Sequence, residues 1–167
     1  GVIFGATGGV MEAALRTAHF LITGKDLENV EFKDVRGLDG VKEASVTIEG
    51  KTIRIAVAHW MSNIETVLNR IREDRAQGKE PSYHFIEVMA CPGGCVGGGG
   101  QPYGATDEIR KKRAAGVYKD DEGSKKRCSH HNEAIKTLYK DFLGEPLGHN
   151  AHKYLHTKYV PRKVYKK

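Results

Sequence analysis

The most constraining feature of this sequence is a glycine-rich stretch that begins directly after a cysteine. Seven of the 20 glycines lie between positions 93 and 104, and two of the three cysteines, Cys91 and Cys95, stand at the start of this stretch. Glycine has no side chain, so it lets the backbone turn sharply and approach another body closely. We therefore expect residues 91–102 to form a loop that receives a ligand.

The spacing of the two thiols predicts a metal-ligand loop of the iron-sulfur type. Cys91 and Cys95 are separated by three residues at the end of an apolar run. Thiolates are the soft ligands that iron-sulfur clusters prefer, and glycine amides can donate hydrogen bonds to cluster sulfur and tune its reduction potential. The spacing alone leaves two alternatives open, a redox-active pair and a purely structural pair.

The third cysteine, Cys128, makes the total odd. An odd count argues against a disulfide framework and favours reduced thiols in the cytoplasm. Three cysteines are also too few for a complete four-thiolate site within this chain. Cys128 lies in a polar segment, and we expect it to be an exposed or half-buried free thiol.

Apolar runs and helical periodicities alternate along the chain, which predicts an α/β fold with a helical tail. The expected strands are residues 1–4, 44–48, 52–58 and 85–90, the middle two forming a hairpin. The expected helices are residues 10–23, 62–78, 106–115 and 132–143. Ser62 and Glu65 have the spacing of a capping box, and residues 119–127 have the composition of a polar linker.

The charge is distributed unevenly. The net charge of +6 combines −4 over residues 1–109 with +10 over residues 110–167. The basic runs at 110–113 and 162–167 could contact nucleic acid, but acidic residues at 120–122 lie between them and no nucleic-acid-reading motif is present, so we expect none. We also expect no membrane span, because no stretch approaches the roughly 18 apolar residues that one requires.

Two weaker patterns have plainer explanations. The Gly5–Gly9 turn before a helix is typical of dinucleotide binding, but it lacks the complete glycine pattern and is followed by the acidic Glu12, so a structural turn is favoured. The histidine-rich region after Cys128 offers metal ligands, but it lacks paired cysteine spacing, which favours a polar surface over a zinc site. Its histidines are His130, His131, His149, His152 and His156.

Three separated motifs resemble the iron-only (FeFe) hydrogenase family. EVMACPGGCVGGGGQP at residues 87–102 is similar to the third cysteine signature of the catalytic subunit, and FGATGGVMEAA at 4–14 is similar to a segment upstream of it. Motifs within 138–159 resemble the C-terminal tail, which some members carry as a separate small subunit. The resemblance implies one lobe of the hydrogenase catalytic domain over 1–105 and a helical, basic, small-subunit-like tail over 106–167.

In that family the active centre, the H-cluster, is a 4Fe-4S cubane joined to a di-iron unit that carries CO, cyanide and a dithiolate. The resemblance implies that Cys91 ligates the cubane and that Cys95 ligates it and bridges to the di-iron unit. It also implies that Met89 packs against the di-iron ligands and that Phe4 and Gly5 form the same pocket. A thioether and an aromatic wall would help to keep water from a site that splits dihydrogen.

The departures from the family pattern are equally informative. The two earlier signatures, which supply the remaining cubane thiolates and the proton relay, do not occur in this sequence. We therefore expect a partner, the N-terminal portion of the catalytic subunit, and an electron carrier, either ferredoxin or an NAD(P)-linked subunit. The chain alone should be inactive. The alternative is a non-catalytic iron-sulfur assembly or sensor homologue.

Overall fold

A three-stranded sheet organises the first part of the chain; the structure, a computed structural model, describes residues 1–161. Strand β1 (Val41–Ile48) pairs antiparallel with β2 (Lys51–His59), and β2 pairs parallel with β3 (Phe85–Met89). The predicted hairpin is confirmed. Its two-residue turn has positive φ at both Glu49 and Gly50, as a type I′ turn requires.

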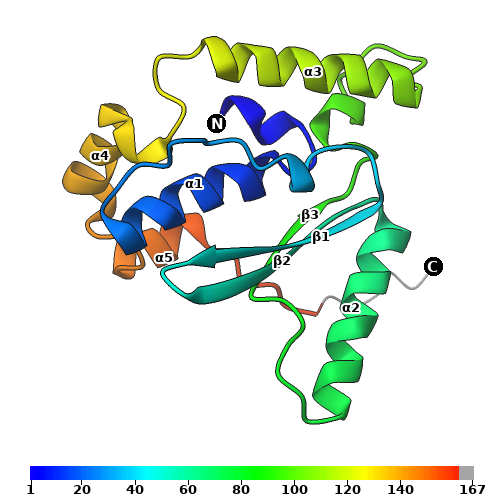
Figure 1. Ribbon diagram of the computed structural model, residues 1–167, viewed down its shortest axis with the longest axis horizontal. Helices are drawn as coiled ribbons and strands as arrows, with labels where there is room; N and C mark the ends of the chain where they lie inside the picture. The colour runs from blue at the N-terminus through cyan, green and yellow to red at the C-terminus, as the bar shows by residue number, and fades with distance from the viewer. Residues whose placement is uncertain (162–167) are drawn as a thin grey trace. The chain divides into compact units, whose positions relative to one another are not determined.

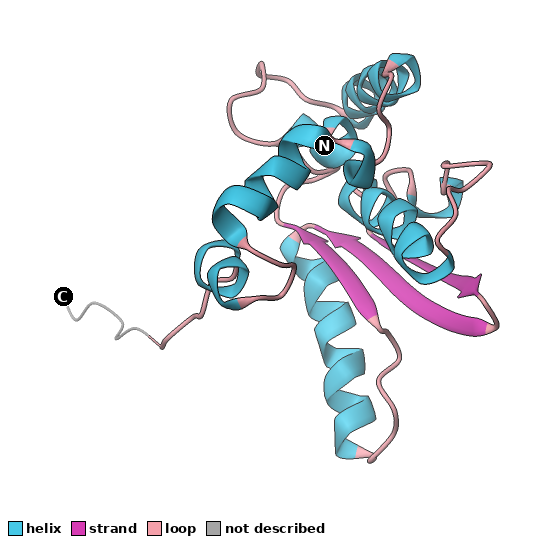
Figure 2. Ribbon diagram, turned by 90° about the vertical axis from the view of Figure 1, so that its left-hand side faces the viewer, coloured by secondary structure: helices cyan, strands magenta, loops and turns pink. Residues whose placement is uncertain are grey.

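Two helices cover the two faces of this sheet. Helix α1 (Gly9–Thr23) lies on one face and α2 (Met61–Ala76) on the other (Figures 1 and 2). Because successive side chains of a strand point to opposite faces, β2 directs Val57 toward α1 and Ala58 toward α2. This arrangement confirms the predicted α/β class.

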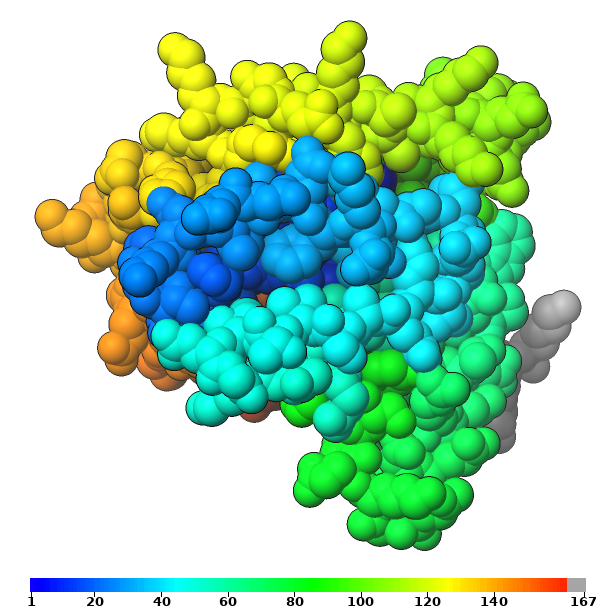
Figure 3. All heavy atoms as spheres, in the orientation of Figure 1, coloured from blue at the N-terminus to red at the C-terminus, as the bar shows by residue number. Residues whose placement is uncertain are grey.

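The segment that follows α1 closes the core on the same side. Residues 24–40, which include the short helix η2 (Lys33–Val35), run across the face shown in Figure 3, between helix α3 (Asp107–Gly123) and the β1–β2 hairpin. Val35 is buried in the α1 core cluster. A Cβ on Gly8 would lie 1.9 Å from the Val35 oxygen, so this position has no room for a side chain.

The third helix is longer than the sequence predicted. Helix α3 (Asp107–Gly123) is capped by Thr106, whose hydroxyl accepts the Ile109 N–H at 3.3 Å, and it continues past the expected end at 115. The linker predicted from 119 is therefore wrong over its first part. The reason is Asp121, which is buried and paired with Arg16 on α1, so this turn packs instead of projecting into water.

The predicted first strand is also wrong. Residues Val2–Gly5 form a 3-10 helix, η1, in which Phe4 N donates to Gly1 O at 3.1 Å and Ala6 N donates to Ile3 O at 3.2 Å. Ile3 is buried, and its carbonyl lies where a Cβ on Gly9 would be. The tight approach of η1 to the start of α1 favours the coiled conformation over an extended one.

The predicted capping box is wrong as well. Helix α2 begins at Met61, one residue before Ser62, and its N-cap is Trp60, with no side-chain cap. The carbonyl of Trp60 accepts the N–H groups of Asn63 and Ile64 at 3.1 Å each. Ser62 is thus already inside the first turn. The apolar face holds as predicted at Ile64, which is buried.

Residues from His130 onward form a second compact unit. It contains α4 (Glu133–Leu138), the π-helix η5 (Tyr139–Leu143) and α5 (His149–Leu155). The predicted cap is confirmed, because Asn132 accepts the Ala134 N–H at 3.1 Å. The two units divide after Ser129, and the domain boundary predicted after 105 remains a prediction. The basic run at 162–167 lies outside the described residues.

Candidate functional site

Strand β3 carries the chain directly into the cysteine loop. Met89 ends the strand, and its carbonyl accepts the Trp60 N–H at 3.0 Å, which ties this end of β3 to the start of α2. Cys91 follows two residues later and is half-buried, whereas Cys95 begins the short helix η3 (Cys95–Gly97) and is exposed. Both cysteines are free thiols, so both are available as ligands.

The loop folds back on itself through three backbone turns. The N–H groups of Gly94, Gly97 and Gly98 donate to the carbonyls of Cys91, Gly94 and Cys95, each at 3.0 Å. These three amides therefore cannot all be free donors to cluster sulfur, as the glycine content had suggested. Their main effect is to fix the relative position of the two cysteines.

Two glycines leave room beside the sulfur atoms. A Cβ on Gly98 would lie 3.1 Å from Sγ of Cys91, and a Cβ on Gly94 would lie 2.7 Å from Sδ of Met89 and 3.0 Å from the Gly5 oxygen. The structure thus brings Met89 and Gly5 together with the loop between the cysteines. Close packing favours glycine at both positions, and Gly94 also has a positive φ of 89°.

The 3-10 helix η1 meets the cysteine loop from the other end of the chain. Thr7 N donates to Gly93 O at 2.9 Å, and a Cβ on Gly5 would lie 3.9 Å from Cγ1 of Val96. Phe4 precedes Gly5 on η1, and the residue is 43% exposed. The predicted pocket residues therefore lie on two segments that the fold joins, with Phe4 toward the solvent.

His59 supports the loop and was not identified from the sequence. Its Nδ1 accepts the Gly93 N–H at 3.1 Å, and its Nε2–H donates to Leu38 O at 3.1 Å. This arrangement requires the neutral ring. Burial lowers the pKa of His59, in agreement with a neutral imidazole, although the bond to Leu38 acts in the opposite direction. Its position at the end of β2, after a run of buried residues, is the sequence signal that could have identified His59 as a supporting residue.

Glu87, within β3, anchors the start of α1. This side chain is buried, and its two oxygens accept the N–H groups of Gly8 at 2.6 Å and Met11 at 2.7 Å. A single acidic residue in the apolar run FIEVM is the signal that could have revealed a buried partner. Since the carboxylate already occupies the N-terminus of α1, the nucleotide-binding alternative loses its phosphate position.

A buried lysine stands behind the same turn. Lys42 Nζ donates to the Thr7 hydroxyl at 3.2 Å and to Gly37 O at 3.0 Å. Burial lowers the pKa of Lys42 to about 8, although the nearby carboxylate of Glu87 acts in the opposite direction. The turn at residues 5–9 is thus held by the carboxylate of Glu87 at Gly8 and by the amine of Lys42 at Thr7.

The remaining predicted residues do not join this site. Cys128 is half-buried, and burial raises the pKa of its thiol, which makes it less reactive. Within residues 1–161, no group of three or more metal-ligand atoms includes Cys91 or Cys95. Among the described residues, Cys91 and Cys95 therefore have no third metal-ligating side chain grouped with them.

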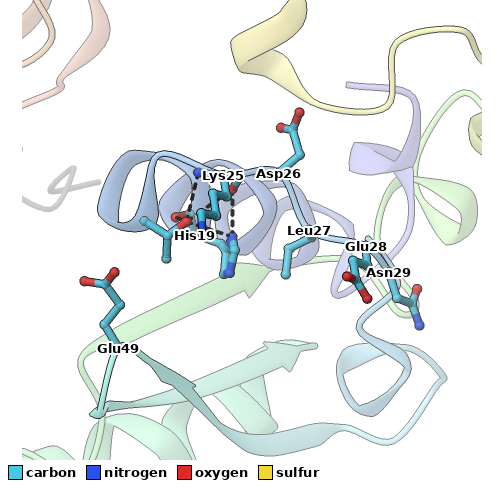
Figure 4. Close-up of a pocket in the computed structure, with 8 residues that line it drawn as sticks. His19, Lys25, Asp26, Leu27, Glu28, Asn29 and Glu49 are labelled. Atoms are coloured by element: carbon cyan, nitrogen blue, oxygen red, sulfur yellow. Dashed lines mark hydrogen bonds between the residues drawn. The ribbon is translucent and has the colours of Figure 1, made fainter.

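A separate hollow of about 610 Å³ lies at the end of α1, lined by His19, Thr23, Lys25, Asp26, Leu27, Glu28, Asn29 and Glu49. Figure 4 shows that the carboxylates of Asp26, Glu28 and Glu49 point in different directions. None of the predicted site residues lines this hollow. A binding site needs polar groups that converge on one ligand, so the hollow is not a candidate.

Comparison with protein families covers both segments of the sequence. Residues 1–99 match the model of the iron only hydrogenase large subunit, C-terminal domain. The chain belongs to the iron-only hydrogenase family. Residues 107–162 of this hydrogenase-family chain match the model of the iron hydrogenase small subunit. In the described residues no helix is long and apolar enough to cross a bilayer.

The hydrogenase relatives are much longer than this chain. It is 50% identical over 161 residues to the NADP-reducing hydrogenase subunit HndD of Solidesulfovibrio fructosivorans, covering 96% of this chain and 26% of the relative. It is 46% identical over 164 residues to iron hydrogenase 1 of Clostridium pasteurianum, and this match covers 95% of this chain and 28% of the relative. The chain thus spans about a quarter of the length of these curated relatives.

A solved structure supports the same assignment. A variant of FeFe-hydrogenase HydA1 from Chlamydomonas reinhardtii superposes with a TM-score of 0.69 at 42% sequence identity, covering 94% of this chain and 45% of that chain. The α/β fold described above is therefore that of a hydrogenase domain.

The family also includes relatives with other names. Protein NAR1 of Arabidopsis thaliana is 31% identical over 95% of this chain and 33% of the relative. A probable cytosolic Fe-S cluster assembly factor of Drosophila willistoni is 32% identical over 92% of this chain and 31% of the relative. The periplasmic Fe hydrogenase large subunit of Nitratidesulfovibrio vulgaris is 55% identical over 60% of this chain and 23% of the relative. Because named compartments differ among relatives, a cytoplasmic location remains a prediction.

Proposed function

We propose that this chain supplies two cysteine ligands, Cys91 and Cys95, to the H-cluster of an FeFe hydrogenase. The observation that carries the proposal is the loop itself, where two free thiols stand at fixed positions and the absence of a side chain at Gly98 leaves space beside the Cys91 sulfur. Soft thiolates fit an iron-sulfur cluster. When bound, the cluster would supply the electron transfer and the dihydrogen chemistry.

The other named residues would shape the pocket. Met89 and Gly5 lie against the same glycine, Gly94, and Phe4 adjoins them on η1. A thioether and an aromatic ring present apolar surface, which would limit the access of water to the reacting centre. We assign these residues pocket roles only.

The proposal requires partners. The two remaining cubane thiolates would come from the N-terminal portion of the catalytic subunit. The printed name of a 50% identical relative, an NADP-reducing hydrogenase subunit, supports an NAD(P)-linked electron-transfer partner, and ferredoxin is the other option. The reduced cysteines favour the cytoplasm as the location of the assembled enzyme.

A pair of serine substitutions tests the proposal. We would co-produce the chain with the polypeptide that carries the other cluster ligands and measure both bound iron and hydrogen evolution. Cys95→Ser should abolish retention of the di-iron unit and hydrogen evolution, because it removes a thiolate that oxygen replaces poorly. Cys128→Ser should leave both unchanged. The reverse pattern would overturn the assignment.

A second candidate function is iron-sulfur assembly or sensing without hydrogen chemistry. The relatives named as Fe-S cluster assembly factors favour it, with 32% identity over 92% of this chain. The two candidates differ in one measurement. An assembled protein that retains an iron-sulfur cluster bound through Cys91 and Cys95 but evolves no hydrogen would support the second candidate.

A further inference from the structure

Two arginines on α3 face the cysteine loop. Arg110 and Arg113 are three positions apart, so they lie on the same side of the helix. The helix contacts η3, the short helix that begins at Cys95. Neither arginine belongs to the cysteine motif, and both belong to the segment that matches the small-subunit model.

Arg113 bridges the two ends of the glycine stretch. Its Nη1 donates to the carbonyl of Val96 at 2.9 Å, and its Nη2 donates to the carbonyl of Pro102 at 3.3 Å. Val96 directly follows Cys95, and its side chain is buried. Because a guanidinium is planar and presents fixed donors, one side chain can hold two carbonyls at a set separation.

Arg110 fills the space that two glycines leave. A Cβ on Gly97 would lie 2.8 Å from Nε and 3.1 Å from Cδ of Arg110, and a Cβ on Gly93 would lie 3.4 Å from the same Cδ. Its Nη1 pairs with Asp107. Its Nε is buried and has no acceptor among the described residues, so packing and the ion pair hold this side chain against the loop.

We propose that Arg113, supported by Arg110, is a positioning residue that holds the Cys91–Cys95 loop in the shape that presents both thiols to the cluster. This inference rests on the proposed function and extends it to a helix outside the cysteine motif. Arg113 also places a positive charge on the loop that carries both cysteines, which would favour the reduced, more negative state of a bound cluster and so raise its reduction potential.

The positioning role is tested first on the full chain without a cluster, by hydrogen exchange at the amides of Gly94, Gly97 and Gly98. Arg113→Gln should accelerate their exchange roughly tenfold, because it removes two hydrogen bonds from a charged donor. Lys112→Gln removes the same charge from an exposed neighbouring position and should change nothing. Equal acceleration in both variants, or none in Arg113→Gln, would overturn the inference.

Arg113→Lys separates geometry from charge. Lysine keeps the positive charge but cannot bridge two carbonyls with a rigid fork. We expect this variant to exchange nearly as fast as Arg113→Gln. Full protection in the lysine variant would overturn the positioning role.

The assembled protein supplies the second readout. In complex with the polypeptide that carries the other ligands, Arg113→Gln should shift the reduction potential of the 4Fe-4S unit to a more negative value and change its electron paramagnetic resonance signal, and Lys112→Gln should not. An unchanged potential and signal would overturn the inference. If the unsubstituted chain takes up no cluster while the exchange results hold, the proposed function fails and the positioning of the loop stands.

Discussion

The carboxylate of Glu87 accepts the backbone N–H of Gly8 at 2.6 Å, although the two residues are 79 positions apart. Its second oxygen accepts the Met11 N–H at 2.7 Å. An anion at this place complements the positive end of α1. It also joins the strand that leads to the cysteines to the turn that contacts Gly93, so the two halves of the candidate site share one anchor.

Glu87→Gln should lower the free energy of unfolding by about 1–2 kcal/mol, because an amide lacks the negative charge and turns an NH2 group toward a backbone N–H. Urea denaturation at neutral pH measures the change. Glu65→Gln on the exposed face of α2 is the matched control and should have little effect. Equal stability of the two variants would contradict the anchoring role.

Arg16→Met should cost on the order of 3 kcal/mol, because it removes the most deeply buried cation paired with Glu12 and Asp121, whose other partners are Arg36 and Arg127. Arg16 is almost fully buried and donates to both oxygens of Asp121 at 3.0 Å and to Glu12 at 2.7 Å. Chemical denaturation in low and high salt measures the loss, which should depend little on salt because the pairs are buried. Arg72→Met, at an exposed position, should be nearly neutral; a comparable loss there would refute the argument.

Gly98→Ala should reduce the iron bound by the assembled protein, because its Cβ would lie 3.1 Å from Sγ of Cys91. The backbone itself tolerates alanine, since φ is −91°. Gly99→Ala is the control, because a Cβ there meets nothing within 4 Å. Iron content and the unfolding free energy of the chain, measured together, separate a blocked thiol from a misfolded loop. Equal iron content in the two variants would show that the space beside Cys91 is not needed.

Lys42 should make stability rise with pH. Burial lowers its pKa in the folded chain to about 8 from the ordinary value of 10.5. Between these values the unfolded chain binds more protons than the folded chain, so the free energy of unfolding increases as the pH rises from 8 to 10.5. Lys42→Met should lose this increase, and Lys51→Met, at an exposed position, should retain it. Parallel curves for Lys42→Met and the unsubstituted chain would count against burial as the cause.

Local patterns predicted the elements whose cause is local. The β1–β2 hairpin follows from β-branched runs around Glu49 and Gly50, and the end of α1 follows from Gly24, which adopts the left-handed conformation. The cysteine loop was predicted for the same reason, because thiols and glycines adjoin in sequence. That Cys91 and Cys95 ligate a cluster remains a prediction.

Contacts between distant segments were not predictable in this way. The capping box at Ser62 failed because the chain enters α2 through Trp60, whose N–H is taken by Met89 O on another strand. The supporting roles of His59 and Arg113 depend on backbone groups of the loop, and backbone groups leave no pattern in the sequence. Only charged residues in apolar runs, such as Glu87, gave an indirect signal.

The ion pair between Arg16 and Asp121 crosses from the segment that matches the large-subunit model to the segment that matches the small-subunit model. If the polypeptide were divided between residues 99 and 107, this folding contact would become a contact between subunits. Each fragment would keep one ion-pair partner of its own, Glu12 for Arg16 and Arg127 for Asp121, and would lose the contact that joins the two pairs. The Arg16–Asp121 pair would then lie in the interface between the fragments, where a buried charged contact can act as a hot spot for association.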